Sequence, residues 1–201
     1  MLWQALERVY TYLGFDAVGG EHFKKLALAR IVEPTSKMEA IRVMEDLGIT
    51  APSLRTIIRT LHRIQADGVR DVVSQASFDY AAATGGLALV LYDVTTLYFE
   101  ADDEDELRKV GMSKERKVDP QITAGLLVDR SGFPLEVQCF EGNKVETKTL
   151  IPVVRAFKER HGIDDLVIVT DAGMLSAANL LALEEAGGEV HGRIQDHESA
   201  V

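Results

Sequence analysis

The sequence has a single cysteine, Cys139, so no disulfide can form within the chain. Such cysteine usage is typical of proteins from a reducing compartment. Because Cys139 lies in an apolar stretch, we expect a buried core thiol rather than a nucleophile. No apolar run approaches the ~20 residues that span a bilayer, and the N-terminal residues MLWQALERVY do not form a signal-peptide pattern. The sequence therefore predicts a soluble cytoplasmic protein without a membrane partner.

Basic residues are also scarce, because 22 Lys and Arg stand against 32 Asp and Glu, for a net charge of −10. The first 80 residues carry equal numbers of each sign, so the whole excess of acid lies in residues 81–201. Proteins that bind DNA usually present a basic face, which this balance disfavours overall. Bound divalent metal would neutralise part of the acid, and the acidic run at residues 102–106 is typical of a solvated loop.

The composition, 46% hydrophobic and 27% charged, is that of a globular protein. Residues 1–75 show apolar positions at helical spacing, with expected stops at Gly14, Pro34, Gly48 and Gly68 and expected caps at Thr35 or Ser36 and at Ser53. Alanines 81–83 and the glycines that follow loosen the pattern. We therefore expect a helical region over residues 1–80 and a second domain over residues 87–201.

The second half changes to β-rich runs. Strands are predicted over residues 87–99, 121–129, 134–142, 165–171 and 189–194, with helices over 145–162 and 176–188. A tight turn at residues 130–133 indicates that the second and third strands form a hairpin. Three antiparallel strands followed by alternating helices and strands is the order of the ribonuclease H-like fold. The predicted fold class is α/β, with such a mixed sheet preceded by an all-helical N-terminal region.

Two aspartates are candidates for chemistry. Asp93 interrupts a buried strand, where a carboxylate is costly unless it is paired or holds a metal. Asp171 ends another short strand before an Ala-Gly turn, where ligands often bind in α/β sheets. Either could instead be structural, as a hydrogen-bonded strand-end or turn residue. If the first strand lies beside the fourth, the two carboxylates are neighbours that suit Mg²⁺ or Mn²⁺ and metal-assisted chemistry at a phosphodiester.

Three segments carry a specific resemblance: LYDVTTLYFE, QITAGLLVDRSGFPLEVQCFEGNKVETKTL and LVIVTDAGMLSAANLLALEEAG. They resemble the catalytic core of DDE transposases from bacterial insertion sequences over residues 88–194, and the likeness extends more weakly to LALARIVEPTSKMEAI. The resemblance implies that Asp93 and Asp171 are the first two metal-binding, catalytic carboxylates. It also implies that Gly142, Asn143 and Glu146 support the site, and that DNA, as element ends and target, is the partner.

The family's third carboxylate lies on a later helix, in a Tyr-x2-Arg-x3-Glu-x6-Lys motif that nothing after Asp171 matches. Glu184 and Glu185 come too early, and Glu198 has no such neighbours. We therefore expect a C-terminally truncated transposase that is inactive by itself. The alternative is a non-enzymatic DNA-binding or transposition-inhibiting module, acting as a homodimer or paired with an intact copy. A phosphatase of the haloacid dehalogenase type is disfavoured because position 95 is Thr where its general acid would stand.

Residues 36–64 form a helix, a glycine turn and a second helix, the outline of a helix-turn-helix. Arg55, Arg59 and Arg63 recur every four residues on the second helix and are candidate DNA contacts. A plain helical hairpin with a solvated face explains the same pattern. Acidic residues on the preceding helix would oppose DNA if they faced it.

Overall fold

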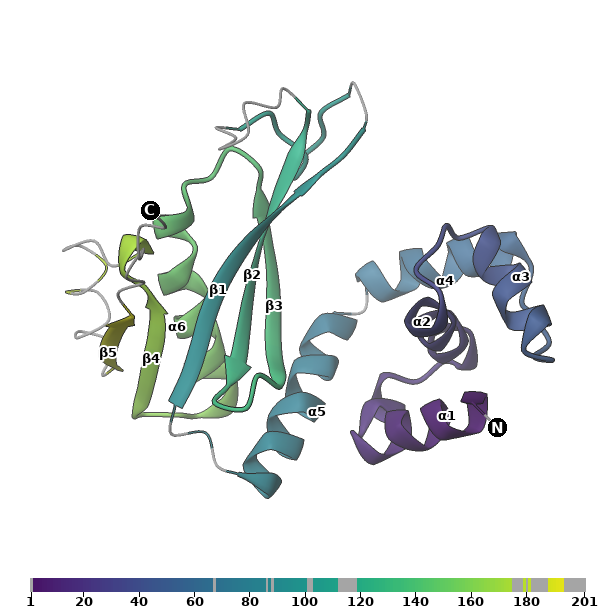
Figure 1. The fold of residues 1–201 in the computed structure, drawn as a ribbon, viewed down its shortest axis with the longest axis horizontal. Helices are drawn as coiled ribbons and strands as arrows, with labels where there is room; N and C mark the ends of the chain where they lie inside the picture. The colour runs from purple at the N-terminus through teal and green to yellow at the C-terminus, as the bar shows by residue number, and fades with distance from the viewer. Residues whose placement is uncertain are drawn as a thin grey trace, which may run out of the picture. The chain divides into compact units, whose positions relative to one another are not determined.

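The computed structural model describes residues 2–66, 68–85, 89–100, 103–111, 119–174 and 188–193, together with residues 87, 179 and 181. The chain divides into two compact units, residues 1–80 and 81–201. In chain order the elements in Figure 1 are α1 (Leu2–Tyr12), η1 (Phe15–Val18), α2 (Glu21–Val32), α3 (Glu39–Asp46), α4 (Leu54–Ala66), α5 (Val69–Thr84), β1 (Leu89–Tyr98), β2 (Gln121–Asp129), β3 (Pro134–Glu141), η2 (Glu146–Lys148), α6 (Leu150–His161), β4 (Leu166–Asp171), η3 (Ala172–Met174) and β5 (Gly188–Arg193).

The first unit is a bundle of short helices around one apolar core. Helix α2 packs against both α3 and α4. The core includes Trp3 of α1, Leu28 of α2, Met44 of α3 and Ile57 of α4, all at most 5% exposed. The predicted cap at Ser53 is confirmed, because its hydroxyl accepts a hydrogen bond from the Thr56 N–H. Burial of Ile57 and its neighbours leaves the opposite side of α4 in solvent.

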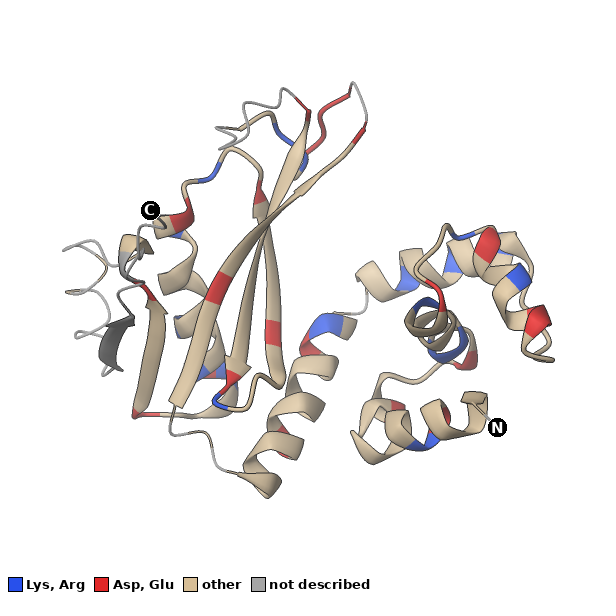
Figure 2. Cartoon of the chain, in the orientation of Figure 1, with Lys and Arg blue, Asp and Glu red and all other residues tan. Residues whose placement is uncertain are grey.

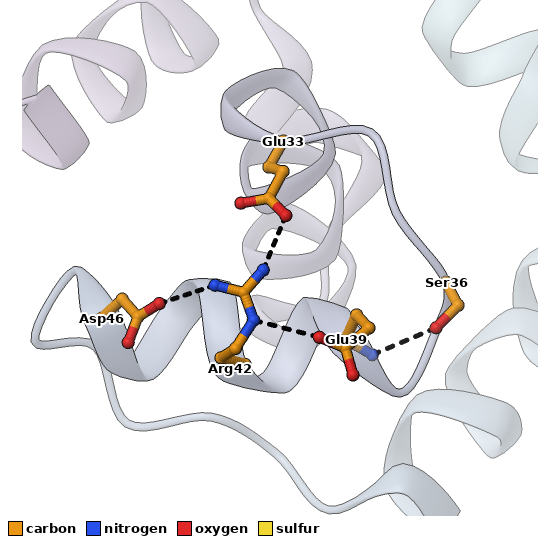
Figure 3. A network of polar contacts seen from close by, with 5 residues as sticks. All are labelled: Glu33, Ser36, Glu39, Arg42 and Asp46. Carbon is orange, nitrogen blue, oxygen red and sulfur yellow. Dashed lines mark hydrogen bonds and ion pairs between the residues drawn. The ribbon is translucent and has the colours of Figure 1, made fainter.

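A polar network fixes the connection from α2 to α3 (Figure 3). The Arg42 guanidinium donates to Glu33 at 2.6 Å, to Glu39 at 3.0 Å and to Asp46 at 2.8 Å. These hydrogen bonds, with the charge of Glu33, hold the pKa of Arg42 above its usual value. Ser36 accepts a hydrogen bond from the Glu39 N–H, but the N-cap residue of α3 is Met38, so the cap expected at Thr35 or Ser36 is wrong. Glu39 and Asp46, two acidic side chains of α3, are therefore both paired with Arg42 of the same helix.

Helix α5 corrects one expectation. We expected residues 81–83 to loosen the pattern, but α5 runs without a break from Val69 to Thr84. Alanine has the highest intrinsic helix propensity, so an alanine run extends a helix rather than ending it. Gly85 follows directly after the last helical residue.

The second unit contains a five-stranded mixed sheet in the order β3-β2-β1-β4-β5. Strands β1, β2 and β3 pair antiparallel, and the hairpin predicted between β2 and β3 is confirmed. In its turn, Asp129 accepts hydrogen bonds from Ser131 and from the Phe133 N–H. Strand β4 pairs parallel with β1 and with β5. This order and these directions are those of the ribonuclease H-like fold, as predicted.

Helix α6 covers one face of this sheet. Its buried residues Val153 and Phe157 are 0% exposed, and the same face of the sheet buries Val90, Leu127 and Ile168. An ion pair between the Arg160 guanidinium and the nearly buried Glu136 carboxylate, at 2.6 Å, joins α6 to β3. The residues that alternate with these point to the other face of the sheet.

Cys139 lies on that other face, on the edge strand β3, and is exposed. The prediction that Cys139 is a buried thiol is therefore wrong, because apolar neighbours in sequence do not indicate which face of a strand is covered. Of the helix predicted over residues 176–188, the structure describes Asn179 and Leu181, which are helical, and Gly188, which instead begins β5; the tail after residue 194 lies outside the described residues. Among the helices that the structure describes, none has the length and apolar character needed to cross a membrane.

Candidate functional site

The register of β1 and β4 brings the two candidate aspartates together. The last registered pair between these parallel strands is Leu91 with Val169. Two residues further along each strand stand Asp93 and Asp171, so continuing the register sets them side by side. Adjacent strands lie about 4.8 Å apart, which is within reach of one shared ion. Because side chains alternate along a strand, both carboxylates project from the same face, opposite α6.

Both carboxylates are exposed. Asp93 accepts a hydrogen bond from the Val94 N–H at 2.8 Å, which orients one of its oxygens. Two neighbouring carboxylates repel each other, and their oxygens are the ligands that Mg²⁺ and Mn²⁺ prefer, so the residues fit a hard divalent cation. Among the described residues, no three His, Cys, Asp or Glu side chains form a metal-binding cluster. The described residues thus offer this pair of exposed carboxylates and no group of three.

Beneath Asp93, on the face covered by α6, lies the buried Tyr92. Burial raises the pKa of Tyr92 to about 12, the Thr149 side chain lowers it, and the charge of Asp93 raises it. The Thr149 hydroxyl donates to the Glu146 carbonyl oxygen at 2.6 Å, and the Tyr92 hydroxyl has no hydrogen-bond partner of good geometry among the described residues. Gly125 of β2 makes room for this ring, because a Cβ there would lie 2.1 Å from the hydroxyl oxygen. The strand that carries Asp93 is therefore anchored by a large neutral side chain.

The segment after β3 contains the three residues that the resemblance marks as supporting. Gly142 is enclosed by backbone: its N–H donates to the Leu107 oxygen, its carbonyl oxygen accepts from the Gln121 side chain, and a Cβ would collide with the Gln121 oxygen. Asn143 lines an open cavity of about 460 Å³. Glu146 begins η2, which contacts η3, the turn directly after Asp171. Gly142 is thus a packing residue, while Glu146 stands in a segment that borders the second aspartate.

Asn179 links these segments, and sequence reasoning did not identify it. Its amide nitrogen donates to the Thr147 carbonyl oxygen at 2.6 Å and to the Met174 carbonyl oxygen at 2.8 Å. The side chain is 9% exposed, so both hydrogen bonds are largely shielded from water. Asn179 therefore ties η2 to the turn after Asp171. Nothing in a single sequence marks an asparagine that acts through backbone oxygens far away along the chain.

The three predicted arginines of α4 do not share one environment. Arg55 and Arg59 are exposed, one helical turn apart. Arg63 is exposed as well, but its guanidinium lies against Gly20, just before α2, where a Cβ would collide with it. Figure 2 shows basic residues along α4, whose sequence contains no Asp or Glu. The exposed basic surface of this helix therefore includes Arg55, Arg59 and Arg63, of which Arg63 also contacts the loop before α2.

Comparison with known protein families shows which family the chain belongs to. The family described as "Transposase DDE domain" matches residues 85–199, more than half of the chain and both candidate aspartates. The chain belongs to the DDE transposase family. In this transposase the matched residues coincide with the unit that carries the sheet, and the helical residues 1–80 precede the match.

Solved structures give only distant likenesses to this transposase. The paired-end complex of Mos1 transposase with the left transposon end is 12% identical, with a TM-score of 0.37, over 87% of this chain and 59% of that one. The Mos1 catalytic domain with raltegravir and Mn is also 12% identical, with a TM-score of 0.37, over 64% of this chain and 60% of that one. This chain thus spans less than two thirds of those proteins. Among curated proteins no match was found.

Proposed function

We propose that this protein is an insertion-sequence transposase whose Asp93 and Asp171 hold a divalent metal at the point where DNA is cut and joined. The observation that supports the proposal is the parallel register of β1 with β4, which, continued two residues beyond Leu91 and Val169, sets these two carboxylates side by side on one face of the sheet. Membership of the DDE family supports it, because the three letters of that name stand for two aspartates and a glutamate. Bound Mg²⁺ or Mn²⁺ would activate a water or hydroxyl and stabilise the leaving oxygen of a phosphodiester.

In this proposal each residue of the site has a separate task. Asp93 and Asp171 supply anionic oxygens, and the Val94 N–H orients the first of them. Asn179 keeps η2 and the turn after Asp171 in fixed relation. The helical residues 1–80 contact DNA through exposed arginines of α4. The exposed free thiol of Cys139 fits a reducing compartment, so we place the activity in the cytoplasm.

Two carboxylates hold a divalent ion weakly, since such ions take six or more ligands and a closed site needs several from the protein. We therefore propose that the 201-residue polypeptide binds Mn²⁺ weakly and cleaves DNA slowly or not at all. The test is calorimetric titration with Mn²⁺ of the unmodified chain, Asp93→Asn and Asp171→Asn. Asp165→Asn is the matched control, because Asp165 is exposed just before β4, at the opposite end of that strand from Asp171. Binding that survives in both site variants, or is lost in the control, would contradict the proposed site.

A non-enzymatic DNA-binding module is the second candidate. Two observations favour it: no third carboxylate clusters with the pair among the described residues, and the charged residues of α4 are all basic. Nicking of supercoiled plasmid with Mn²⁺ separates the two candidates. Nicking that disappears in Asp93→Asn supports the enzyme, whereas DNA binding without nicking supports the module.

A further inference from the structure

The end of β3 lies on the same face of the sheet as the two candidate aspartates. The register sets Asp93 opposite Leu126 of β2, and Leu126 opposite Val137 of β3. Cys139 follows two residues after Val137, so its side chain projects from the same face. Two strand spacings of about 4.8 Å and two residues of about 3.3 Å put the Cα atoms of Asp93 and Cys139 roughly 12 Å apart. A polymer that crosses the sheet at Asp93 can therefore reach Cys139 within a few of its units.

An open cavity of about 460 Å³ reaches this face at Cys139. Its polar lining comes from Glu141, Asn143, Lys144 and Lys148, which follow one another closely in the segment after β3. The volume is within the range of ligand sites in proteins. Because the cavity is open to solvent, it suits a group that belongs to a larger molecule.

The two lysines of this cavity form no ion pair in the part of the chain that the structure describes. The Lys144 Nζ atom lies 4.5 Å from the centroid of the Phe140 ring, a contact that holds the ammonium group in one place. Lys109, by contrast, is paired with Glu104. Residues 81–201 carry the whole excess of acid of this protein, so two unpaired cations in one cavity there point to an anionic ligand.

The segment that carries the second lysine is fixed before any ligand binds. The Lys148 N–H donates to the Val145 carbonyl oxygen at 2.9 Å, within a tight turn. Asn179 donates to the carbonyl oxygen of Thr147, directly before Lys148, and to the turn after Asp171. The cavity and the second candidate aspartate are therefore joined by hydrogen bonds.

Glu141 narrows the choice of anion. Its carboxylate is exposed and also lines the cavity, so the lining carries two positive groups and one negative group. A phosphodiester has a single negative charge and suits this balance. Free phosphate or pyrophosphate carries more charge and is repelled more strongly by Glu141.

We propose that the cavity at the end of β3 binds a phosphodiester of the DNA strand that passes the two aspartates. Lys144 and Lys148 are its positioning residues. The inference rests on the proposed function for the choice of DNA, and it adds the direction in which the strand crosses the sheet, from β4 towards β3 (Figure 1). At about 3.4 Å per nucleotide, the cavity holds the backbone roughly three to four nucleotides from the point of metal binding.

Cys139 reports on this cavity without any engineering, because it is the only cysteine and is exposed. The experiment measures how fast the full chain reacts with a neutral maleimide in Mn²⁺, without DNA and with duplex DNA. Fluorescence anisotropy of the labelled duplex shows that each sample is saturated. The ratio of the two rates is the protection factor, in which the intrinsic reactivity of the thiol cancels. Bound duplex is expected to slow the reaction roughly fivefold or more, because its backbone covers the cavity.

Lys144→Gln with Lys148→Gln is expected to lose this protection at saturating DNA. The slope of log affinity against log salt concentration should also become shallower by about 1, as for one lost phosphate contact. Lys144→Arg with Lys148→Arg keeps both charges and is expected to keep the protection, which a loss of packing would not explain. If the double Gln variant melts at a lower temperature, Lys148→Gln alone, at an exposed position, is expected to show part of the loss.

The matched control is Arg130→Gln with Arg155→Gln. Arg130 is exposed in the turn at the opposite end of the β2–β3 hairpin, and Arg155 is exposed on α6, which covers the other face of the sheet. The control removes the same charge from the same unit and is expected to keep the full protection factor. Circular dichroism melts verify that each variant is folded.

Four results would overturn the proposal: no duplex binds or protects Cys139, the folded double Gln variant is protected as strongly as the unmodified chain, the control loses protection, or inorganic phosphate protects as well as duplex. The last result would assign the cavity to a small anion instead of DNA.

The metal site is tested separately, by the Mn²⁺ titration of the two aspartate variants. A chain that binds Mn²⁺ through Asp93 and Asp171 and binds duplex without protecting Cys139 refutes the cavity alone. A chain that shows lysine-dependent protection but binds no Mn²⁺ refutes the proposed metal site and leaves the cavity in place.

Discussion

If Asp93 and Asp171 hold a metal ion as proposed, their mutual repulsion opposes folding without the ion, and the bound ion supports folding. The effect on stability of replacing either aspartate is therefore expected to change sign between metal-free and metal-containing buffer. At a separation of about 5 Å, two unit charges repel by about 0.8 kcal/mol in water and about 3 kcal/mol at an effective dielectric constant of 20. Because Asp93 and Asp171 are exposed, the lower figure applies. Asp93→Asn and Asp171→Asn are therefore expected to leave the metal-free melting temperature unchanged or to raise it by about 1–3 °C in a chain of this length.

Mn²⁺ is expected to reverse the stability ranking of the unmodified chain and the two Asn variants. At a concentration one hundred times its dissociation constant, an ion that binds only the folded state stabilises it by about 2.7 kcal/mol. The unmodified chain is then expected to melt roughly 5–10 °C higher, and neither Asn variant should follow it. The stability ranking in EDTA is therefore expected to be inverted in Mn²⁺.

Differential scanning calorimetry in EDTA and in Mn²⁺ measures both effects on the same samples. Asp165→Asn is expected to behave as the unmodified chain in both buffers. The reasoning is refuted if the Asn variants are clearly less stable than the unmodified chain in EDTA, or if they gain as much as it does from Mn²⁺. The first result would mean that these carboxylates are structural hydrogen-bond acceptors, and the second that the ion binds elsewhere.

Three further substitutions test the surroundings of the site. Asn179→Asp replaces the amide donor by an acceptor that repels the Thr147 oxygen. The free energy of unfolding, measured with urea, should therefore fall by about 1–3 kcal/mol, and Mn²⁺ binding should weaken. Unchanged values would contradict the linking role of Asn179. Tyr92→Phe should not lower the melting temperature at pH 7. It should reduce the loss of stability between pH 10 and 12, because tyrosine ionises there in the unfolded chain but Tyr92 does not ionise in the folded one. A loss of stability equal to that of the unmodified chain would count against this. Gly125→Ala should destabilise by about 1–3 kcal/mol or more in the same unfolding assay, and this cost should shrink in the Tyr92→Phe background if the hydroxyl is what the new methyl meets.

The strand order was predictable because it depends on regular features, and the expectation that Asp93 and Asp171 lie close together follows from that order. Buried strands form continuous apolar runs, and a polar residue within such a run is conspicuous. The hairpin turn at residues 130–133 is local and is read from its own residues. From these the fold order follows, and with it the neighbouring positions of the first and fourth strands.

The details that were missed depend on contacts between distant residues. The exposure of Cys139 is decided by α6 covering only one face of the sheet, which no local pattern records. The role of Asn179 depends on two backbone oxygens in separate turns. The length of α5 was missed for a different reason, since its alanines favour helix by themselves.

Strand β1 is longer than its neighbour β4, and this difference has a consequence for access. The registered pairs of β1 with β4 end at Leu91, whereas those of β1 with β2 continue to Tyr98. The registered sheet therefore narrows at the level of Asp93, whose carboxylate is exposed. Duplex DNA is stiff over about 150 base pairs and cannot be bent into a narrow opening at low cost. If DNA is the substrate, as proposed, an exposed carboxylate at this narrowing suits approach from the side, at any point along the polymer and without a free end.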